Sequence, residues 1–244
     1  MSTPRRVALE PAYLLHHRDY SDSSRIVELL TRGHGRVSLF ARGVRRQKSR
    51  LRGVLQPFTP LLASWTGGPE GGQLTGAELA AEAVPLPPAR LMSAFYLNEL
   101  LLRLTPRGDA VPEVFEAYAI ALEELRSGAS EAPALRHFEL DLLGHLGYGV
   151  DVAAEAGGGE PLAADRYYHF RPGVGAYAVE DTGDREGAYL GRHLLALARR
   201  RLEEPDVLRA ARRLLRDALD HCLEGRGLRS REVMLALRRK EAEK

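Results

Sequence analysis

The segment Arg36–Arg42, RVSLFAR, alternates between two kinds of side chain and predicts a β-strand that is buried on one face. Successive side chains of a strand point to opposite faces, so the two sets separate. The inward set is apolar and consists of Val37, Leu39 and Ala41. The outward set consists of Arg36, Ser38, Phe40 and Arg42. We therefore expect a strand that packs on a core with one face and presents cations on the other.

Four further strand-like segments accompany this strand in the first 84 residues. They are Val7–Arg18, Arg25–Arg32, Phe58–Thr66 and Gln73–Ala83. The tripeptide Gly33-His34-Gly35 is expected to form a turn, because glycine adopts positive φ without steric cost. Five short strands joined by glycine-containing turns are typical of a small barrel, and an OB-like barrel has this number of strands. We expect residues 1–84 to form such a domain.

The apolar pattern becomes helical after Pro85-Leu86-Pro87-Pro88, a stiff connection that indicates a domain boundary. Residues 85–244 are therefore expected to form a helical domain, which makes the overall class α+β. The expected helices are Ala89–Leu104, 111–125, Pro133–Leu146, Ala188–Leu202 and Pro205–Leu223. Asp109 is the expected N-cap of the second helix, and the charged tail Leu237–Lys244 is expected to fray. Residues 151–184 break the helical pattern and predict a small β-hairpin insertion.

The composition limits the class of protein. The chain has 244 residues, of which 44% are hydrophobic and 28% charged, as in ordinary globular domains. A membrane-spanning helix needs about 18 or more apolar residues in a row. The most apolar stretch, Leu91–Leu104, is interrupted by Asn98, Glu99 and Arg103, so we expect no such helix. The polar start, Met1–Arg6, indicates no secretory signal, and we expect a cytoplasmic protein.

The charge is concentrated in one window of the sequence. Between Leu29 and Pro69 there is no Asp or Glu, and the window alone carries a formal charge of +8 on a chain whose net charge is +2. Its cations are Arg32, Arg36, Arg42, Arg45, Arg46, Lys48, Arg50 and Arg52. A local field of this strength attracts phosphate even on a nearly neutral protein. The window therefore indicates that the partner is nucleic acid or another polyanion.

We expect the outer face of the alternating strand and the loop Gly43–Gly53 to bind nucleic acid. Guanidinium groups fork onto phosphate oxygens, and the Phe40 ring offers a stacking surface to any base. Trp65 is a second candidate for stacking, although a core position is favoured. The candidate nucleic-acid-binding residues are Arg36, Phe40, Arg42, Arg45, Arg46, Lys48, Arg50 and Arg52. This combination suits binding that reads few bases.

No residue pattern indicates catalysis, a metal or a cofactor. The candidate metal ligands on the third helix are His137, Asp141 and His145. Eight residues rise about 12 Å along a helix, which is too far for one ion to bind both ends of this set. The single cysteine, Cys222, excludes a disulfide framework and a Cys-rich metal site. Glu99, inside an apolar helix, is expected to hold that helix to a neighbour through hydrogen bonds.

Several short motifs resemble the RecO family of DNA repair and recombination mediators, and they follow one another in the order expected for that family. In the first part of the chain they are TRGHGR at Thr31–Arg36, ARGVRR at Ala41–Arg46 and LQPF at Leu55–Phe58. In the remainder they are YLNELL at Tyr96–Leu101, RHFELDLL at Arg136–Leu143, LGYG at Leu146–Gly149 and LRSRE at Leu228–Glu232. Each motif is weak alone, but together they span most of the chain.

The resemblance implies an N-terminal OB-fold, a helical C-terminal domain and a non-enzymatic function in a nucleoid-associated protein. It implies binding of single- and double-stranded DNA, annealing of complementary strands and, with RecR, loading of RecA onto DNA covered by single-strand-binding protein. The acidic C-terminal tail of that protein is expected on the helical domain, with Arg103, Arg136 and Arg192 as candidate contacts. Many relatives carry a four-cysteine zinc module, but residues 151–184 contain no cysteine, so we expect no zinc here.

Three alternatives stay open from the sequence. The basic window could bind an acidic protein partner instead of DNA, which would make the chain an adaptor. The same barrel could bind RNA. A hydrolase using the His and Asp residues is the third alternative, and the absence of nucleophile-elbow, Walker A, dinucleotide-binding and zincin motifs argues against it.

Overall fold

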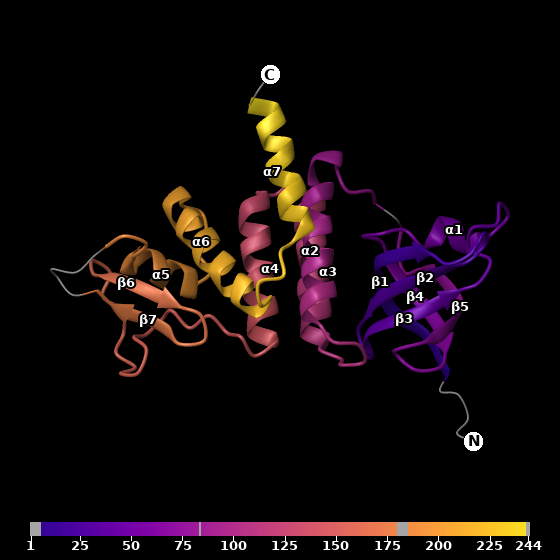
Figure 1. Ribbon diagram of the computed structural model, residues 1–244, viewed down its shortest axis with the longest axis horizontal. Helices are drawn as coiled ribbons and strands as arrows, with labels where there is room; N and C mark the ends of the chain where they lie inside the picture. Colours follow the sequence, from indigo (N-terminus) through magenta and orange to yellow (C-terminus); the bar gives the residue numbers. More distant parts are fainter. Residues whose placement is uncertain (1–5, 83, 180–184, 243–244) are drawn as a thin grey trace. The chain divides into compact units, whose positions relative to one another are not determined.

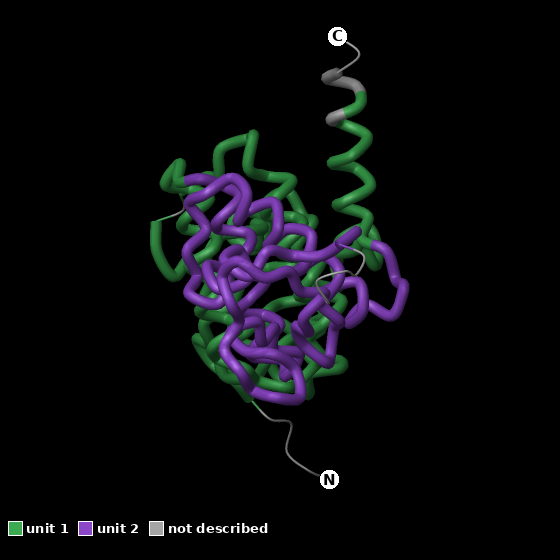
Figure 2. The backbone as a smooth tube through the Cα atoms, turned by 90° about the vertical axis from the view of Figure 1, so that its left-hand side faces the viewer, with its two compact units in different colours: residues 1–129, 228–244 green, residues 130–227 purple. Residues whose placement is uncertain are grey.

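The computed structural model describes residues 6–82, 84–179 and 185–242. The chain divides into two compact units (Figure 2), here called the first unit, residues 1–129 with 228–244, and the second unit, residues 130–227. The class is α+β, as expected. The division of the sequence into residues 1–84 and 85–244 remains a prediction about its modules, which limited proteolysis can test.

Five strands of the first unit form a β-barrel (Figure 1). They are β1 (Arg6–Asp19), β2 (Arg25–Thr31), β3 (Gly35–Ala41), β4 (Pro60–Thr66) and β5 (Gly72–Leu79). The pairing order is β1-β2-β3-β5-β4, and β4 pairs again with β1, which closes the sheet. The pair β3–β5 is parallel and the other four pairs are antiparallel. The prediction of a five-stranded OB-like barrel is confirmed; a short helix between β3 and β4, α1 (Arg50–Val54), was not predicted.

The barrel core follows the alternation of β3. Val37, Leu39 and Ala41 are all buried, as expected, together with Trp65 of β4. Ser38 is the exception among the outward residues, since it is buried as well. It lies opposite Glu28 of β2, and its amide donates to the carbonyl oxygen of Pro69 at 2.8 Å. The loop between β4 and β5 therefore lies against this part of the barrel.

Three helices and one short 3-10 helix complete the first unit. They are η1 (Pro88–Arg90), α2 (Leu91–Leu104), α3 (Pro112–Arg126) and α7 (Arg229–Ala242). The prediction that Asp109 is the N-cap of this helix is wrong, because α3 begins at Pro112 and its N-cap is Val111. The backbone of Asp109 instead packs on Gly35, where a Cβ atom would lie 2.1 Å from the Asp109 carbonyl oxygen. Gly35 also has a φ of +65°, so this turn requires glycine for two reasons.

A buried polar contact anchors α2 and α3 to strand β1. The Asn98 side chain on α2 donates to the carbonyl oxygen of Leu15 at 2.9 Å, and the Tyr118 hydroxyl on α3 donates to the Asn98 carbonyl oxygen at 2.5 Å. Burial raises the pKa of Tyr118 well above its usual value, so the phenol stays protonated and remains a donor. The Tyr13 ring of β1 packs on Phe115 and Tyr118 with centroid distances of 5.3 and 5.1 Å. The barrel and these helices therefore share one interior.

The second unit is built around a small sheet and three helices. The helices are α4 (Glu131–His145), α5 (Gly191–Ala198) and α6 (Pro205–Cys222), and the strands are β6 (Tyr167–Arg171), β7 (Gly175–Ala178) and β8 (Tyr189–Leu190). The predicted β-hairpin insertion is confirmed as β6–β7. The predicted helix Ala188–Leu202 is too long, because Tyr189 and Leu190 pair with β6 as a strand before α5 begins.

Helix α7 was not predicted, and its N-terminus is held by Glu99 of α2. The Glu99 carboxylate accepts hydrogen bonds from the amides of Arg229 at 2.9 Å and Ser230 at 2.8 Å, and from the Ser230 hydroxyl at 2.6 Å. A carboxylate at a helix N-terminus also interacts favourably with the helix dipole. The prediction that Glu99 holds its helix to a neighbour is confirmed. Burial alone would raise the pKa of Glu99, but the hydrogen bonds from Ser230 and Arg229 outweigh it and lower this pKa.

Replacing Glu99 by Gln is expected to destabilise the first unit by about 1–2 kcal/mol at pH 7, because hydrogen bonds to a charged group are lost. Since the folded pKa of Glu99 lies below its unfolded value, its contribution is present above the unfolded pKa and is lost as the pH falls through the folded pKa. The difference between the two proteins should therefore shrink below about pH 4. Urea unfolding at several pH values measures this difference in the free energy of unfolding, with the exposed Glu123→Gln variant as control. An equal difference at pH 7 and pH 3 would contradict this assignment.

Candidate nucleic-acid interface

The loop that follows β3 is fixed to the barrel by apolar side chains. Val44 and Leu55 are buried in the barrel core, and Leu51 and Val54 of α1 pack against it. Gly43 begins the loop with a φ of +68°, which turns the chain out of the strand. The apolar residues thus face the core while the cations between them face solvent. The segment Arg42–Arg52 is called the basic loop below.

The basic loop is also attached to the turn between β1 and β2. The Arg45 amide donates to the Ser23 carbonyl oxygen at 3.0 Å, and the Arg45 guanidinium donates to the Ser21 carbonyl oxygen at 2.8 Å and lies 3.5 Å from the Asp19 carboxylate. Asp19 also accepts a hydrogen bond from Arg25 at 2.9 Å. That bond, together with the charges of Arg45 and Arg25, lowers the pKa of Asp19. Arg45 is therefore partly neutralised within the protein.

Five cations of the basic loop are exposed and form no ion pair with a carboxylate in the part of the chain that the structure describes. They are Arg42, Arg46, Lys48, Arg50 and Arg52. Arg50 and Arg52 lie on helix α1, and Arg42, Arg46 and Lys48 lie before this helix in the chain. Their charges are available to a ligand in solution. An excess of positive charge on one short segment, without acids to offset it, is the electrostatic footprint of a phosphate-binding surface.

Arg36, a nucleic-acid-binding candidate from the sequence, does not belong to this exposed group. Its side chain is only 14% exposed and lies 3.0 Å from the Glu28 carboxylate, while two of its guanidinium nitrogens donate to the Thr105 carbonyl oxygen at 2.9 and 3.0 Å. Arg32, a cation of the same sequence window, pairs with Glu116 at 2.8 Å. Both cations are therefore engaged by acids that lie outside the acid-free window.

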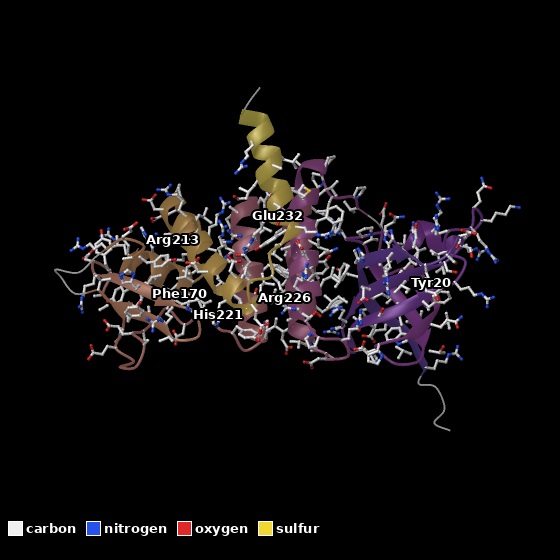
Figure 3. All side chains as sticks on the ribbon, viewed as in Figure 1. Tyr20, Phe170, Arg213, His221, Arg226 and Glu232 are labelled. Atoms are coloured by element: carbon white, nitrogen blue, oxygen red, sulfur yellow. The ribbon has the colours of Figure 1, made fainter. Side chains whose placement is uncertain are left out.

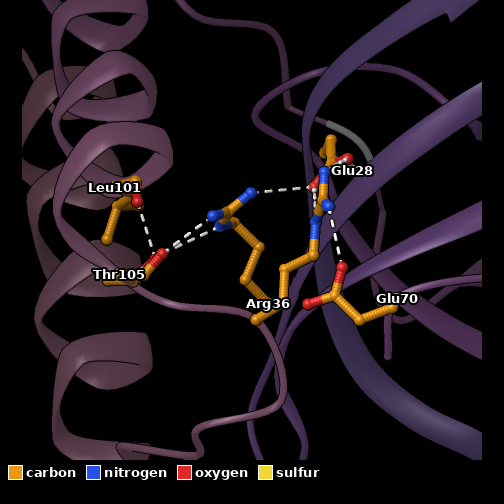
Figure 4. A network of polar contacts seen from close by, with 6 residues as sticks. Glu28, Arg36, Glu70, Leu101 and Thr105 are labelled. Carbon is orange, nitrogen blue, oxygen red and sulfur yellow. Dashed lines mark hydrogen bonds and ion pairs between the residues drawn. The ribbon is translucent and has the colours of Figure 1, made fainter. Parts of the chain in front are cut away.

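Glu28 is the centre of a polar network that joins the barrel to the segment between α2 and α3 (Figure 4). Besides Arg36, it accepts hydrogen bonds from Arg107 at 2.5 and 3.2 Å. Arg107 in turn donates to the exposed Glu70 at 3.0 Å. The hydrogen bonds to Glu28 raise the pKa of Arg107 and keep it charged. One buried carboxylate thus holds two guanidinium groups, and this network is structural.

Phe40 has a neighbour that the sequence analysis missed. Tyr20, which is labelled in Figure 3, is 66% exposed. Its ring meets the Phe40 ring edge to face with a centroid distance of 5.3 Å. Both rings lie beside the basic loop, since Tyr20 precedes the turn that binds Arg45 and Phe40 precedes Arg42. Trp65, the other candidate for stacking, is buried and packs on His34, so its expected core position is confirmed. The accessible aromatic pair is therefore Tyr20 and Phe40.

The three arginines expected to contact an acidic tail are divided between the units. Arg103 belongs to the first unit and lies 4.0 Å from Glu99. Arg136 and Arg192 belong to the second unit. Arg136 is buried and pairs with Glu139 at 2.5 Å, whereas Arg192 is exposed and pairs with Asp165 at 2.7 Å. Because Arg136 is buried and paired with Glu139, it is not an accessible contact for such a tail.

Asp141 and His137 of α4, considered above as metal ligands, contact Arg200 instead. The Asp141 carboxylate accepts two hydrogen bonds of 2.7 Å from Arg200, and His137 contacts the Arg200 carbonyl oxygen at 3.2 Å. In the described residues no group of three or more His, Cys, Asp or Glu side chains could hold a metal ion. Asp141 thus fixes the segment that follows α5.

These features define a class of protein, an OB-like barrel protein with an exposed cationic loop and a helical C-terminal region. Comparison with known families narrows the class. The family profile "Recombination protein O N terminal" matches residues 6–82, and "Recombination protein O C terminal" matches residues 87–232. The chain therefore belongs to the RecO family of DNA repair proteins, which confirms the resemblance seen in its motifs.

Individual relatives agree with the family profiles over nearly the full length of the chain. The chain is 44% identical over 230 residues to the DNA repair protein RecO of Methylococcus capsulatus, covering 94% of each chain. It is 43% identical over 227 residues to that of Photobacterium profundum, covering 93% of this chain and 95% of the relative. No helix among the described residues is long and apolar enough to span a membrane.

Proposed function

We propose that the basic loop binds the phosphate backbone of DNA without sequence specificity and that this binding promotes the annealing of complementary strands. The observation that carries the proposal is the exposure of five cations without carboxylate partners among the described residues: Arg42, Arg46, Lys48, Arg50 and Arg52. When cations neutralise phosphates on two strands, the repulsion between the strands falls, and pairing needs no nucleotide hydrolysis. The protein would therefore act as a mediator and not as an enzyme.

Tyr20 and Phe40 support binding to single strands in particular. Their rings lie next to the basic loop, and a base that stacks on an exposed aromatic ring contributes about 1–3 kcal/mol regardless of its identity. A double-stranded ligand keeps its bases stacked on each other, so it would engage only the cations. We infer that both ligands bind and that single strands gain the additional stacking contribution.

Membership of the family supports a further proposal about protein partners. We propose that the chain acts with RecR and contacts the acidic tail of single-strand-binding protein. RecA would then be loaded onto DNA that is covered by single-strand-binding protein. We propose that this takes place at the nucleoid, in the cytoplasm. Of the arginines considered for the tail, Arg103 and Arg192 are accessible and remain candidates. Binding of a tail peptide to Arg103→Ala and Arg192→Ala variants tests this part.

The proposal about DNA is tested by the salt dependence of binding to an oligo(dT) strand. Five phosphate contacts on a single strand predict that log affinity falls by about 3 to 4 per log unit of salt. Fluorescence anisotropy at a series of salt concentrations measures this slope. A slope below about 1 would exclude the loop as a phosphate-binding surface.

Competition distinguishes the two remaining candidate functions, with unlabelled oligo(dT), oligo(U) and poly-glutamate as competitors. If the chain is an adaptor for acidic proteins, poly-glutamate should displace the labelled strand. If it is an RNA-binding protein, oligo(U) should displace the labelled strand more effectively than oligo(dT). Preferential competition by oligo(dT) is the result expected for a DNA repair protein.

A further inference from the structure

The hairpin β6–β7 of the second unit carries aromatic side chains on a face that no function described above uses. Tyr168 is fully buried, so its side of the hairpin faces the interior of the unit. Phe170, labelled in Figure 3, shares that side because side chains two residues apart on a strand point the same way. The opposite side carries Tyr167, His169 and Arg171 of β6.

Contacts between the side chains confirm that these residues form one surface. His169 lies directly opposite Tyr177 of β7, and the two rings have a centroid distance of 5.8 Å. The Arg171 guanidinium lies over the Tyr177 ring at 5.6 Å, and the Arg185 guanidinium lies over the Tyr167 ring at 4.6 Å. The five residues are called the hairpin outer face: Tyr167, His169, Arg171, Tyr177 and Arg185.

The chemistry of the hairpin outer face fits unpaired bases. Arg171 and Arg185 are exposed, and the guanidinium group of each lies over a tyrosine ring. Aromatic rings on neighbouring strands of a sheet can stack two or three bases, as in RNA-recognition sheets. Guanidinium groups beside the rings then reach the phosphates. An acidic peptide would use the cations but would leave the rings without a partner.

We propose that the hairpin outer face is a second binding surface for single-stranded nucleic acid, in which bases stack on Tyr167, His169 and Tyr177. The proposal rests on the proposed function of the basic loop, because it adds a second surface for the same class of ligand. The two surfaces belong to different compact units. A protein with two separate surfaces for single strands can hold two strands at once, and annealing requires two.

Photo-crosslinking of the full-length protein to an oligonucleotide that contains 5-iodouracil tests this surface without any substitution. Peptides that contain Tyr167, His169 or Tyr177 are expected to carry crosslinked nucleotide. Crosslinks confined to residues of the first unit would overturn the proposal and leave the function of the basic loop intact. A protein that forms no crosslinks and does not bind oligo(dT) would instead refute the function of the basic loop.

Annealing of two complementary oligonucleotides provides the second readout. The double variant Tyr177→Ala, Arg171→Gln is expected to slow annealing by about five-fold or more, which corresponds to the loss of one stacked base. The matched control, Tyr148→Ala with Arg226→Gln, removes an exposed tyrosine and an exposed arginine of the same unit that lie outside this face. Equal annealing rates for the double variant and the control would assign the hairpin outer face to another partner, such as a protein, and would overturn the proposal.

Discussion

Replacing Arg42, Arg46, Lys48 and Arg50 by Gln is expected to lower the affinity for an oligo(dT) strand by about 100-fold or more at roughly 0.1 M salt. Each phosphate contact on a single strand contributes about 0.7 to the salt slope, so four contacts lower the slope by about 3. The four side chains are exposed and are not among the residues that fix the loop, so the fold should be retained. Fluorescence anisotropy measures the affinity, and urea unfolding verifies the fold.

The control for this variant must change the net charge by the same amount. Four exposed and ion-paired arginines of the second unit provide it when they are replaced by Gln: Arg166, Arg209, Arg216 and Arg226. Because their charges are already offset by acids, their removal should change the affinity only slightly. If both quadruple variants lose affinity equally, binding depends on net charge alone and the basic loop has no special role.

Replacing Glu28 by Ala is expected to give the second large effect, a decrease in the free energy of unfolding. The Glu28 side chain is 12% exposed and holds the guanidinium groups of Arg36 and Arg107. Removing one partner of a buried ion pair costs about 3–5 kcal/mol, because the remaining charge stays desolvated. Arg107 is about one third exposed, so water partly compensates it, and we expect a loss near the lower limit, about 3 kcal/mol. Chemical unfolding followed by the fluorescence of the single tryptophan, Trp65, measures this loss.

Glu70→Ala is the matched control, because it removes another carboxylate that binds Arg107. Glu70 is 73% exposed, and the free energy of unfolding should change by less than about 1 kcal/mol. A Glu28→Ala protein that unfolds at the same urea concentration as the control would show that the network does not stabilise the barrel.

The barrel could be predicted from the sequence because its strands follow local rules. The alternation of β3 and the glycine turn before it depend only on residues that are near one another in the chain. Helix α7 could not be predicted in the same way, because its exposed apolar residues Val233, Leu235 and Leu237 are spaced two apart and do not follow a helical period. Its attachment depends on Glu99, which lies about 130 residues away along the chain.

The contacts around the candidate site could not all be predicted, for a related reason. The acid-free window begins at Leu29, one residue after the carboxylate that neutralises Arg36. In the register of β2 and β3, Arg36 lies opposite Leu30, so Glu28 is its diagonal neighbour across the two strands. Tyr20 was missed because its contact with Phe40 likewise depends on the folding of a hairpin. Counting charges along the chain does not reveal neighbours across a sheet.

The path of the chain limits how the molecule can be dissected. The polypeptide leaves the first unit after Ala129 and returns to it at Leu228, so the second unit is an insertion within the first. Truncation at residue 129 would therefore remove α7 as well and leave the Glu99 carboxylate without its backbone donors. An internal deletion of residues 130–227, closed by a flexible linker, is the cut that would preserve the barrel together with all of its helices.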